Sequence, residues 1–484
     1  MRAGRYAVVL MALLSPVVWL APGCGARSDL DETDETSEPG RDAGPDASPD
    51  VSADVSPDVS PDVSPDVPGD TPSDVPADVP ADVPIDVPED VPIDVPEDVP
   101  ADVPEDVPPD VPEDVPADVP EDVPPDVMPD GPCQDADGDG YTTCDDDCDD
   151  SDPLVNPGAF DFVNGLDDDC DGAGDNPLIA CGGGLAYTSQ DPIDYAKAID
   201  LCQTTTLGAM GADKKWGLIS AEFRLANGTG APAPIAHAIV TSLGSVLGPR
   251  KNENFVYLSS GPAGVPGQQY WQPGVPQGSQ PNNTSSSMPP GFPTNKAGCP
   301  IPLSSTAFDP VNLRLTVRTP TNAQSFGFEH GFFSAEYPEW ACSFYNDMWV
   351  ALVDTGASGI ANNKNVIFDA QGTPGTVNLN FFDRCVAGQT GCAGGTLGFN
   401  FCAGGKAELA GTGFGDPESP CGSPSSVGGA TGWLTTESPM LAGEVITVQF
   451  IVWDTSDGIL DSSAMLDDFH WLEPPLANPI TYRP

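Results

Sequence analysis

The sequence predicts a mainly β protein in which a β-sandwich or jelly-roll-like domain follows a disulfide-rich metal-binding knot and a disordered, acidic, proline-rich stalk. Three observations lead to this prediction. An Asp/Val/Pro repeat places proline at every fourth position, a D-x-D-x-D-G loop lies among closely spaced cysteines, and the C-terminal half consists of short β-branched and aromatic runs between Gly, Pro, Asn and Ser. Short strands with many turns are typical of sandwiches and jelly rolls.

Residues 1–23 have the pattern of an export signal. Arg2 and Arg5 precede an apolar run over 6–20, which is too short for a comfortable membrane span. The Ala-Pro-Gly-Cys sequence that ends at Cys24 resembles a bacterial lipoprotein box, which implies cleavage before Cys24 and a lipid on its sulfur. We therefore expect a lipid anchor in the outer membrane, at the cell surface. The alternative is ordinary cleavage, a free Cys24 and secretion.

Residues 24–130 form a low-complexity stalk whose repeats read D-V-S-P and then D-V-P-x. Proline at this spacing is incompatible with helix and sheet, and it holds the residue before it in an extended conformation. Repulsion between the aspartates extends the chain further. Because polyproline II rises ~3.1 Å per residue, about eighty residues reach on the order of 200 Å, enough to clear a surface polysaccharide layer.

The charge of the chain argues against nucleic acid as a partner. Asp and Glu number 74 against 17 Lys and Arg, which gives a formal net charge of −57. Such a chain repels nucleic acid and anionic lipid headgroups. No Lys or Arg occurs between Asp42 and Ala196, so the acidity belongs to the stalk and the metal-binding segment rather than to the large domain.

Residues 131–175 contain a candidate calcium loop. Three aspartates alternate from Asp135 to Asp139 and Gly140 follows, as in the first half of a twelve-residue calcium loop. Hard cations prefer oxygen ligands, and the alternative is a solvated acidic turn that binds nothing. The predicted ligands are Asp135, Asp137, Asp139, Asp146 and the backbone carbonyl of Tyr141. A second cation is expected among Asp147, Asp149, Asp152, Asp167, Asp169 and Asp171.

Three runs within this segment carry a resemblance to a known family. They read D-A-D-G-D-G-Y, D-C-D-D-S-D-P-L-V-N-P-G-A and N-G-L-D-D-D-C-D-G. Together they resemble the MopE-type metal-binding motif of bacterial, myxobacterial-type surface proteins, a family whose name is associated with copper. The segment contains no His and no Met, and its cysteines are expected in disulfides. An all-oxygen ligand set favours calcium over copper.

The cysteines fit an exported, lipidated chain. There are 13, so lipidation of Cys24 leaves an even number for disulfides. A zinc site is disfavoured because the chain has 3 His and lacks paired C-x-x-C units. Proximity along the chain, which does not fix connectivity, suggests pairing of Cys133 with Cys144, Cys148 with Cys170, Cys181 with Cys202, Cys299 with Cys342, Cys385 with Cys392, and Cys402 with Cys421.

The large domain, expected over 176–474, begins with a helix and continues as strands, and a tail over 475–484 follows. Asp191 would cap a helix that starts at Pro192. The clearest strand patterns start at Trp216, Val377 and Val445.

Several runs of this domain also resemble a family. They are A-H-A-I-V-T-S-L-G-S-V-L at Ala236, F-G-F-E-H-G-F-F-S-A-E-Y-P-E-W at Phe326, F-Y-N-D-M-W-V-A-L-V at Phe344 and W-D-T-S-D-G-I-L-D-S-S-A-M-L-D-D-F at Trp453. In this order they resemble the choice-of-anchor L domain of secreted and surface bacterial proteins. The resemblance implies a surface β domain with variable anchoring and no established chemistry.

No catalytic motif is found, so we expect a non-enzymatic protein. The sequence lacks H-E-x-x-H, G-x-S-x-G and a phosphate-binding loop. Glu336 and Asp347 would suit glycoside hydrolysis, but a structural brace or a cation site is the favoured interpretation. The expected role is binding or adhesion to a glycan or a neighbouring cell. A polysaccharide-degrading hydrolase and a structural envelope protein are the alternatives.

Overall fold

The computed structural model describes residues 133–176, 181–265, 268–269, 282–392, 398–414 and 428–484. The expected export signal, Cys24 and the expected stalk lie outside these residues. The described part is mainly β, as expected, with a short α-helix, α1 (Pro192–Ala198), and antiparallel sheets. In this part of the chain, none of the helices has the length and apolar character needed to cross a membrane.

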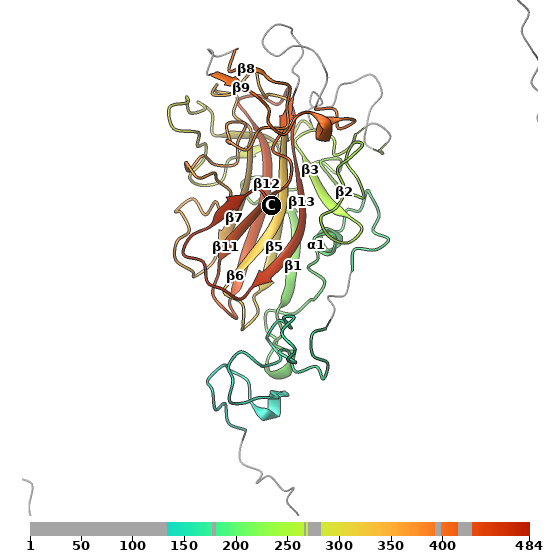
Figure 1. Cartoon of the computed structure of the whole chain (residues 1–484), viewed down its shortest axis with the longest axis vertical. Coiled ribbons are helices and arrows are strands. Elements are labelled where there is room, and N and C mark those ends of the chain that lie inside the picture. Colours follow the sequence, from blue (N-terminus) through green and yellow to red (C-terminus); the bar gives the residue numbers. More distant parts are fainter. Residues whose placement is uncertain (1–132, 177–180, 266–267, 270–281, 393–397, 415–427) are drawn as a thin grey trace, which may run out of the picture. The chain divides into compact units, whose positions relative to one another are not determined.

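Two antiparallel sheets form the domain (Figure 1). The first has the order β1 (Gly217–Arg224), β5 (Thr306–Arg318), β12 (Val445–Thr455) and β7 (Met348–Asp354), and β4 (Ser285–Ser287) also pairs with β5. The second has the order β14 (Ile480–Tyr482), β11 (Leu434–Pro439), β6 (Ser325–Ser334), β13 (Ser462–Leu472), β3 (Phe255–Ser259) and β2 (His237–Val240), and β10 (Gly429–Ala430) pairs with β6. A separate hairpin joins β8 (Gly388–Thr390) to β9 (Gly398–Asn400).

The two sheets pack face to face through apolar side chains. Phe328 on β6 and Phe450 on β12 meet edge to face, with ring centroids 5.0 Å apart. Along β12, Ile446, Val448 and Phe450 are buried while the residues between them are more exposed, which is the alternation of a strand with one core-facing side. Burying one such side chain stabilises the fold by roughly 1.5–3 kcal/mol. The interior between the sheets is therefore an apolar core in which any charged group needs a partner.

Chain connections cross between the sheets at both ends of the sandwich. At one end, β5 stops at Arg318 and β6 begins at Ser325. At the opposite end, β6 leads into β7, and β12 leads into β13, where Ser462 pairs with Ser334. The first end receives the metal-binding segment, and the second gathers several acidic side chains, as described below.

The expected helix and two of the three expected strands are present. Asp191 caps α1 by accepting a hydrogen bond from the Ile193 amide at 3.0 Å. The Trp216 and Val445 runs form β1 and β12. The strand expected from Val377 is wrong: these residues form successive turns, in which the Leu379 amide donates to the Thr376 carbonyl at 2.9 Å. Apolar composition marked this run as buried without fixing its backbone geometry.

Four of the expected disulfides are confirmed, namely Cys133–Cys144, Cys148–Cys170, Cys181–Cys202 and Cys299–Cys342. The pairing of Cys385 with Cys392 is wrong, and so is that of Cys402 with Cys421, because Cys385 bonds to Cys402. The β8–β9 hairpin, in which Gly388 faces Asn400, brings the two cysteines to a Cα separation of 5.3 Å. Cys392 is disulfide-bonded as well, and Cys421 lies outside the described residues.

The C-terminal residues belong to the sheet. The expected tail contributes β14, whose Thr481 faces Thr436 of β11. Their hydroxyl groups lie 2.8 Å apart, and the same Thr436 hydroxyl lies 2.8 Å from Nε2 of the buried His330. The domain therefore extends almost to the end of the chain.

Candidate metal centre

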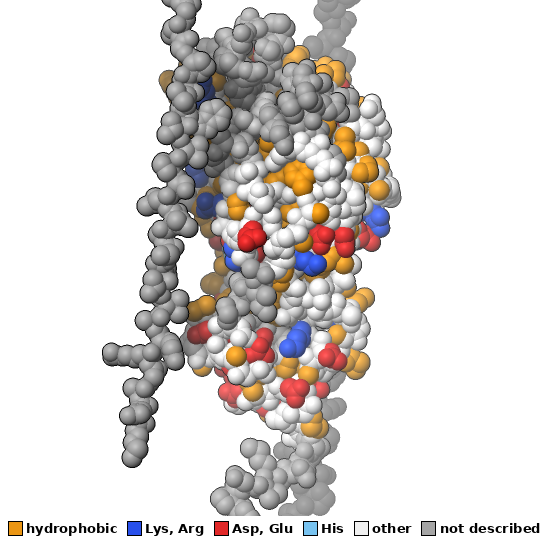
Figure 2. Space-filling view, turned by 90° about the vertical axis from the view of Figure 1, so that its right-hand side faces the viewer, with side chains coloured by type: hydrophobic (Ala, Val, Ile, Leu, Met, Phe, Trp, Pro, Cys, Tyr) orange, Lys and Arg blue, Asp and Glu red, His pale blue; other side chains and the backbone are white. Residues whose placement is uncertain are grey.

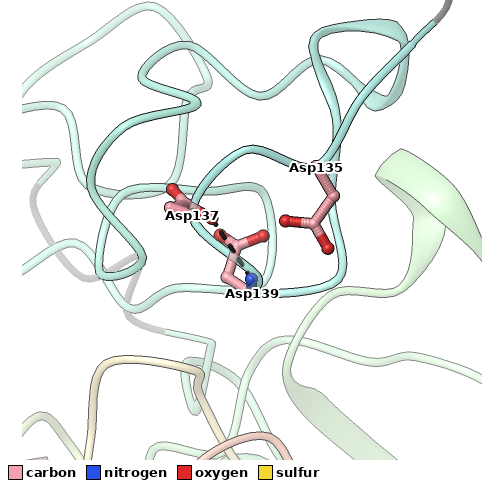
Figure 3. A group of neighbouring side chains, drawn as sticks. All are labelled: Asp135, Asp137 and Asp139. Atoms are coloured by element: carbon pink, nitrogen blue, oxygen red, sulfur yellow. Dashed lines mark hydrogen bonds between the residues drawn. The ribbon is translucent and has the colours of Figure 1, made fainter. Parts of the chain in front are cut away.

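The first acidic loop closes around the carboxylate of Asp135. Its Oδ1 accepts a hydrogen bond from the Gly138 amide at 2.6 Å, and its Oδ2 accepts one from the Gly140 amide at 3.0 Å. Gly138 and Gly140 have φ angles of 87° and 92°, which glycine adopts without steric cost. The carboxylates of Asp135, Asp137 and Asp139 turn toward one another within this loop (Figure 3). Their ligand atoms lie within 4.8 Å of one another.

Backbone amides occupy one oxygen of each inner carboxylate and leave the other without a donor. Oδ1 of Asp137 accepts from the Asp139 amide at 3.2 Å, and Oδ1 of Asp139 accepts from the Tyr141 amide at 2.8 Å. The Oδ2 atoms of Asp137, Asp139 and Asp147 are buried and accept no hydrogen bond from the described residues. Buried polar oxygens without donors are costly, and a cation would supply the missing partner.

Asp147 lies close enough to the first triad to feel its charge, although it is not among the three residues whose ligand atoms converge. Burial raises the pKa of Asp139, and the charge of Asp137 raises it further. The pKa of Asp147 is also raised, first by burial and then by the charges of Asp139 and Asp137. The neighbouring charges therefore disfavour the ionised forms of Asp139 and Asp147, and a bound cation would reverse that effect.

The structure does not bring Asp146 into this group. Asp146 is exposed and ends the 3₁₀ helix η1 (Thr143–Asp145) in the left-handed conformation, with φ 64°. The next residue, Asp147, is turned inward, and its amide donates to the Thr142 carbonyl at 3.2 Å. The spacing of a twelve-residue loop did not predict this, because η1 ends at Asp146 and leaves its side chain exposed.

A second loop repeats the geometry of the first. Asp167 accepts hydrogen bonds from the amides of Asp171, at 3.1 Å, and Gly172, at 2.9 Å. The ligand atoms of Asp167, Asp169 and Asp171 lie within 4.8 Å of one another. Burial raises the pKa of Asp169, as does the charge of Asp171, while Lys215 opposes the shift. The sequence shows this signal, because these residues have the same D-x-D-x-D-G spacing as the first loop.

Asp149 and Asp152 belong to neither triad. Asp149 accepts a hydrogen bond from the Ser151 hydroxyl at 2.6 Å, and Asp152 accepts one from the Leu154 amide at 3.1 Å. Both carboxylates therefore stabilise turns between the two loops. The Cys148–Cys170 disulfide, with a Cα separation of 5.6 Å, ties these turns to the second loop.

Tyr141 anchors the first loop to the large domain. Its side chain is buried, its hydroxyl donates to the Lys214 carbonyl, and the Lys214 ammonium lies 5.2 Å from its ring centroid. Burial raises the pKa of this phenol to about 12. Gly158 allows the close contact, since a Cβ there would lie 2.2 Å from the Tyr141 hydroxyl oxygen. The side chain of Tyr141 is thus fixed in place, and its backbone carbonyl is the ligand predicted from the sequence.

A second contact fixes the segment against the connection between β5 and β6. The Gly158 carbonyl accepts a hydrogen bond from the Thr321 amide at 3.1 Å. The Asn322 side chain pairs with both backbone groups of Phe160, at 2.8 Å for each hydrogen bond. Phe160 also packs against Trp216, with ring centroids 5.3 Å apart. Order in the acidic loops is therefore coupled to the large domain through the chain over 156–160.

A separate cavity of about 720 Å³ opens in the large domain beside the β8–β9 hairpin. Phe399 and Phe401 line it, with exposed fractions of 50% and 80% and ring centroids 5.0 Å apart. Lys296 and Asn380 line it as well and hydrogen-bond to each other at 2.6 Å. Exposed aromatic rings beside polar groups in a concave surface are typical of a ligand site. No motif or spacing in the sequence marks these residues in advance.

Comparison with known proteins places a metal-binding motif in the acidic segment. Residues 147–176 match the family Cu-binding_MopE, described as "Putative metal-binding motif". The match includes the second triad, whereas the first triad lies before it. No curated protein and no solved structure matches the chain. The metal-binding motif expected from the sequence is therefore confirmed over this range, and the choice-of-anchor L resemblance stays a prediction.

Proposed function

We propose that this protein is a cell-surface lipoprotein in which a calcium-stabilised segment supports a β-sandwich domain used for binding or adhesion. The proposal of a bound metal rests on one observation. The Oδ2 atoms of Asp137, Asp139 and Asp147 are buried and accept no hydrogen bond from the described residues. The matched motif supports metal binding by the neighbouring loop.

Ligand chemistry favours calcium over copper. The segment offers carboxylate and carbonyl oxygens, it contains no His or Met, and its four cysteines are held in disulfides. Copper prefers nitrogen and sulfur ligands, whereas calcium takes six to eight oxygens. The acidic loops therefore suit a calcium ion, and the copper in the family name is the competing assignment.

The ion would act as a structural staple. Each triad concentrates negative charge that opposes compaction, and a cation that binds only the folded loops stabilises them by mass action. Tyr141 and Asn322 connect these loops to the large domain. The metal would thus keep ordered the segment that follows the predicted stalk in the sequence.

The aromatic cavity is the proposed ligand site of the large domain. On the face drawn in Figure 2, acidic and basic side chains are scattered among apolar and uncharged ones rather than gathered in one patch. The cavity itself is lined by aromatic and polar side chains, which favours recognition by stacking and hydrogen bonds. Phe399 and Phe401 would pack on the apolar face of a glycan, and Lys296 and Asn380 would lie near its hydroxyl groups.

A glycan array probed with the full chain and with Phe401→Ala tests this proposal. We expect calcium-independent binding to a restricted set of glycans that is lost in the variant, while Phe344→Ala, an exposed phenylalanine that is not among the residues lining the cavity, binds as the wild type does. Binding to no glycan would favour the structural envelope protein. Release of reducing sugar from bound polysaccharide would favour the hydrolase.

A further inference from the structure

Four acidic side chains lie near one another inside the large domain, at the end of the sandwich where β6 leads into β7 and β12 leads into β13. The charges of the other three raise the pKa of Asp454, after its burial, so the four carboxyl groups share one neighbourhood. They come from four separate places in the chain: Glu336 follows β6, Asp347 precedes β7, Asp454 lies near the end of β12, and Asp461 precedes β13.

All four side chains are buried. The exposed fraction is 2% for Glu336, 1% for Asp347 and Asp454, and 0% for Asp461. Among the described residues, no Lys, Arg or His forms an ion pair with Glu336, Asp347 or Asp454. Buried charges of this kind are normally paired or coordinate metals, because an unpaired one is very costly.

Protein donors satisfy Asp347 but leave oxygens of Asp454 and Glu336 without a partner among the described residues. Asp347 accepts hydrogen bonds from the Ser462 hydroxyl at 2.6 Å and from the Thr455 amide at 3.0 Å. Both carboxyl oxygens of Asp454, and Oε2 of Glu336, are buried without a hydrogen-bond partner in the described part of the chain. The Ser260 hydroxyl lies near Asp454 but donates to the Ser462 carbonyl, at 3.2 Å. Three buried carboxyl oxygens of the cluster therefore accept no hydrogen bond from the described residues.

The surrounding backbone is shaped to hold the cluster. The pairing of β12 with β5 shifts register between Val452 and Asp454, and such bulges commonly re-aim a side chain. Gly261 leaves room for Asp461, since a Cβ there would lie 2.1 Å from its Oδ2 atom. The Ser462 amide donates to the Ser260 hydroxyl at 2.9 Å and holds β13 beside the end of β3.

We propose that Glu336, Asp347, Asp454 and Asp461 bind a buried hard divalent cation, and that their all-oxygen chemistry selects calcium. This site is distinct from the acidic loops of residues 133–176. A cation would partner the three orphaned oxygens and offset the mutual repulsion of the carboxylates. The ion would close the end of the sandwich by joining residues from both sheets.

Protonated carboxyl groups are the competing explanation. Burial raises the pKa of Asp347 to about 8 and raises those of Glu336 and Asp454 well above their ordinary values. Without an ion, the cluster would therefore hold protons at neutral pH. A cluster neutralised by protons would hold no metal, whereas a cluster neutralised by a cation would hold one ion. The metal content therefore distinguishes the two explanations.

The test measures tightly held metal in the full chain after removal of the loop sites. We would prepare a background variant, Asp137→Asn with Asp169→Asn, dialyse it with millimolar calcium at neutral pH, desalt it and determine its metal content. We expect it to retain about one calcium per chain, the content of a single site. In the same background, Asp454→Asn should lose that calcium, and Asp354→Asn, on the exposed surface of β7, should keep it.

Terbium luminescence provides the second measurement. Terbium substitutes for calcium and is sensitised by nearby tryptophan, and Trp453 directly precedes Asp454. We expect sensitised emission from the background variant and its loss in Glu336→Gln, which serves if Asp454→Asn does not fold. Absence of retained calcium in the folded background variant would overturn the proposal. Calcium content and terbium emission that are unchanged by both cluster substitutions would also overturn it.

Discussion

Replacing Asp137 with Asn should uncouple the first loop from calcium. Asp137 supplies one of three buried Oδ2 atoms, and the neutral amide keeps its size while removing the charge. Extracellular calcium modules bind with a Kd of roughly 10⁻⁴ to 10⁻³ M. At about 2 mM calcium, such a site stabilises the folded loop by roughly 0.6–1.8 kcal/mol. A tenfold weaker site would contribute about 0.1–0.6 kcal/mol under the same conditions.

Proteolysis after Tyr141 reports this stability. Tyr141 is buried, so chymotrypsin cuts there only when the loop opens, and the cleavage rate follows the open population when reclosing is fast. Chelation should raise the wild-type rate by a factor of about 3–20, which is the mass-action factor at that calcium concentration. In Asp137→Asn the factor should fall to about 1–3. The matched control is Asp149→Asn, an exposed carboxylate of the same segment outside both triads.

Two results would refute this reasoning. One is a wild-type cleavage rate that is the same in calcium and in chelator. The other is an equal loss of calcium protection in Asp149→Asn and Asp137→Asn, because that would attribute the effect to total charge rather than to the triad.

Two further predictions rest on the structure, and a third rests on the sequence. His330 is buried, its Nδ1 accepts from Trp349 Nε1 at 3.0 Å, and burial lowers its pKa to about 3. Between pH 6.5 and that value the unfolded state binds a proton that the folded state excludes, so the free energy of unfolding decreases as the pH is lowered. In urea unfolding, the wild type should lose about 2 kcal/mol more than His330→Gln when the pH is lowered from 7 to 5. Equal losses would contradict this assignment. Asn322→Ala removes two hydrogen bonds to Phe160 and should destabilise the docked segment by about 1–3 kcal/mol in the same assay, whereas no change would show that docking does not depend on this side chain. Cys24→Ala should move the protein from the detergent phase to the aqueous phase, and an unmodified Cys24 in mass spectrometry of the wild type would exclude the lipid anchor.

Local patterns allowed much of the fold to be predicted. Asp191 and Pro192 are adjacent cap and first-turn residues, so the start of α1 could be read from two positions. Alternating burial in β12 is likewise a property of consecutive residues. The disulfides that were predicted correctly join cysteines that are neighbours among the cysteines of the sequence.

Features that depend on three-dimensional contacts were not predictable in this way. Cys385 bonds to Cys402 because a hairpin turns the chain back, although Cys392 lies closer in sequence. Asp146 is turned to solvent because it ends η1 in the left-handed conformation, which loop spacing alone does not reveal. The buried acidic cluster joins residues more than one hundred positions apart, from Glu336 to Asp461, and only sheet packing brings them together.

Calorimetric titration of the oxidised full chain with calcium and with copper(II) tests the central claim most directly. We predict heat of binding for calcium that is reduced in Asp137→Asn and in Asp169→Asn, and no comparable heat for copper, because the ligands are oxygens and the cysteines of the segment are in disulfides. Absence of calcium heat at millimolar concentration, together with copper binding that these substitutions abolish, would contradict the assignment of calcium to the acidic loops.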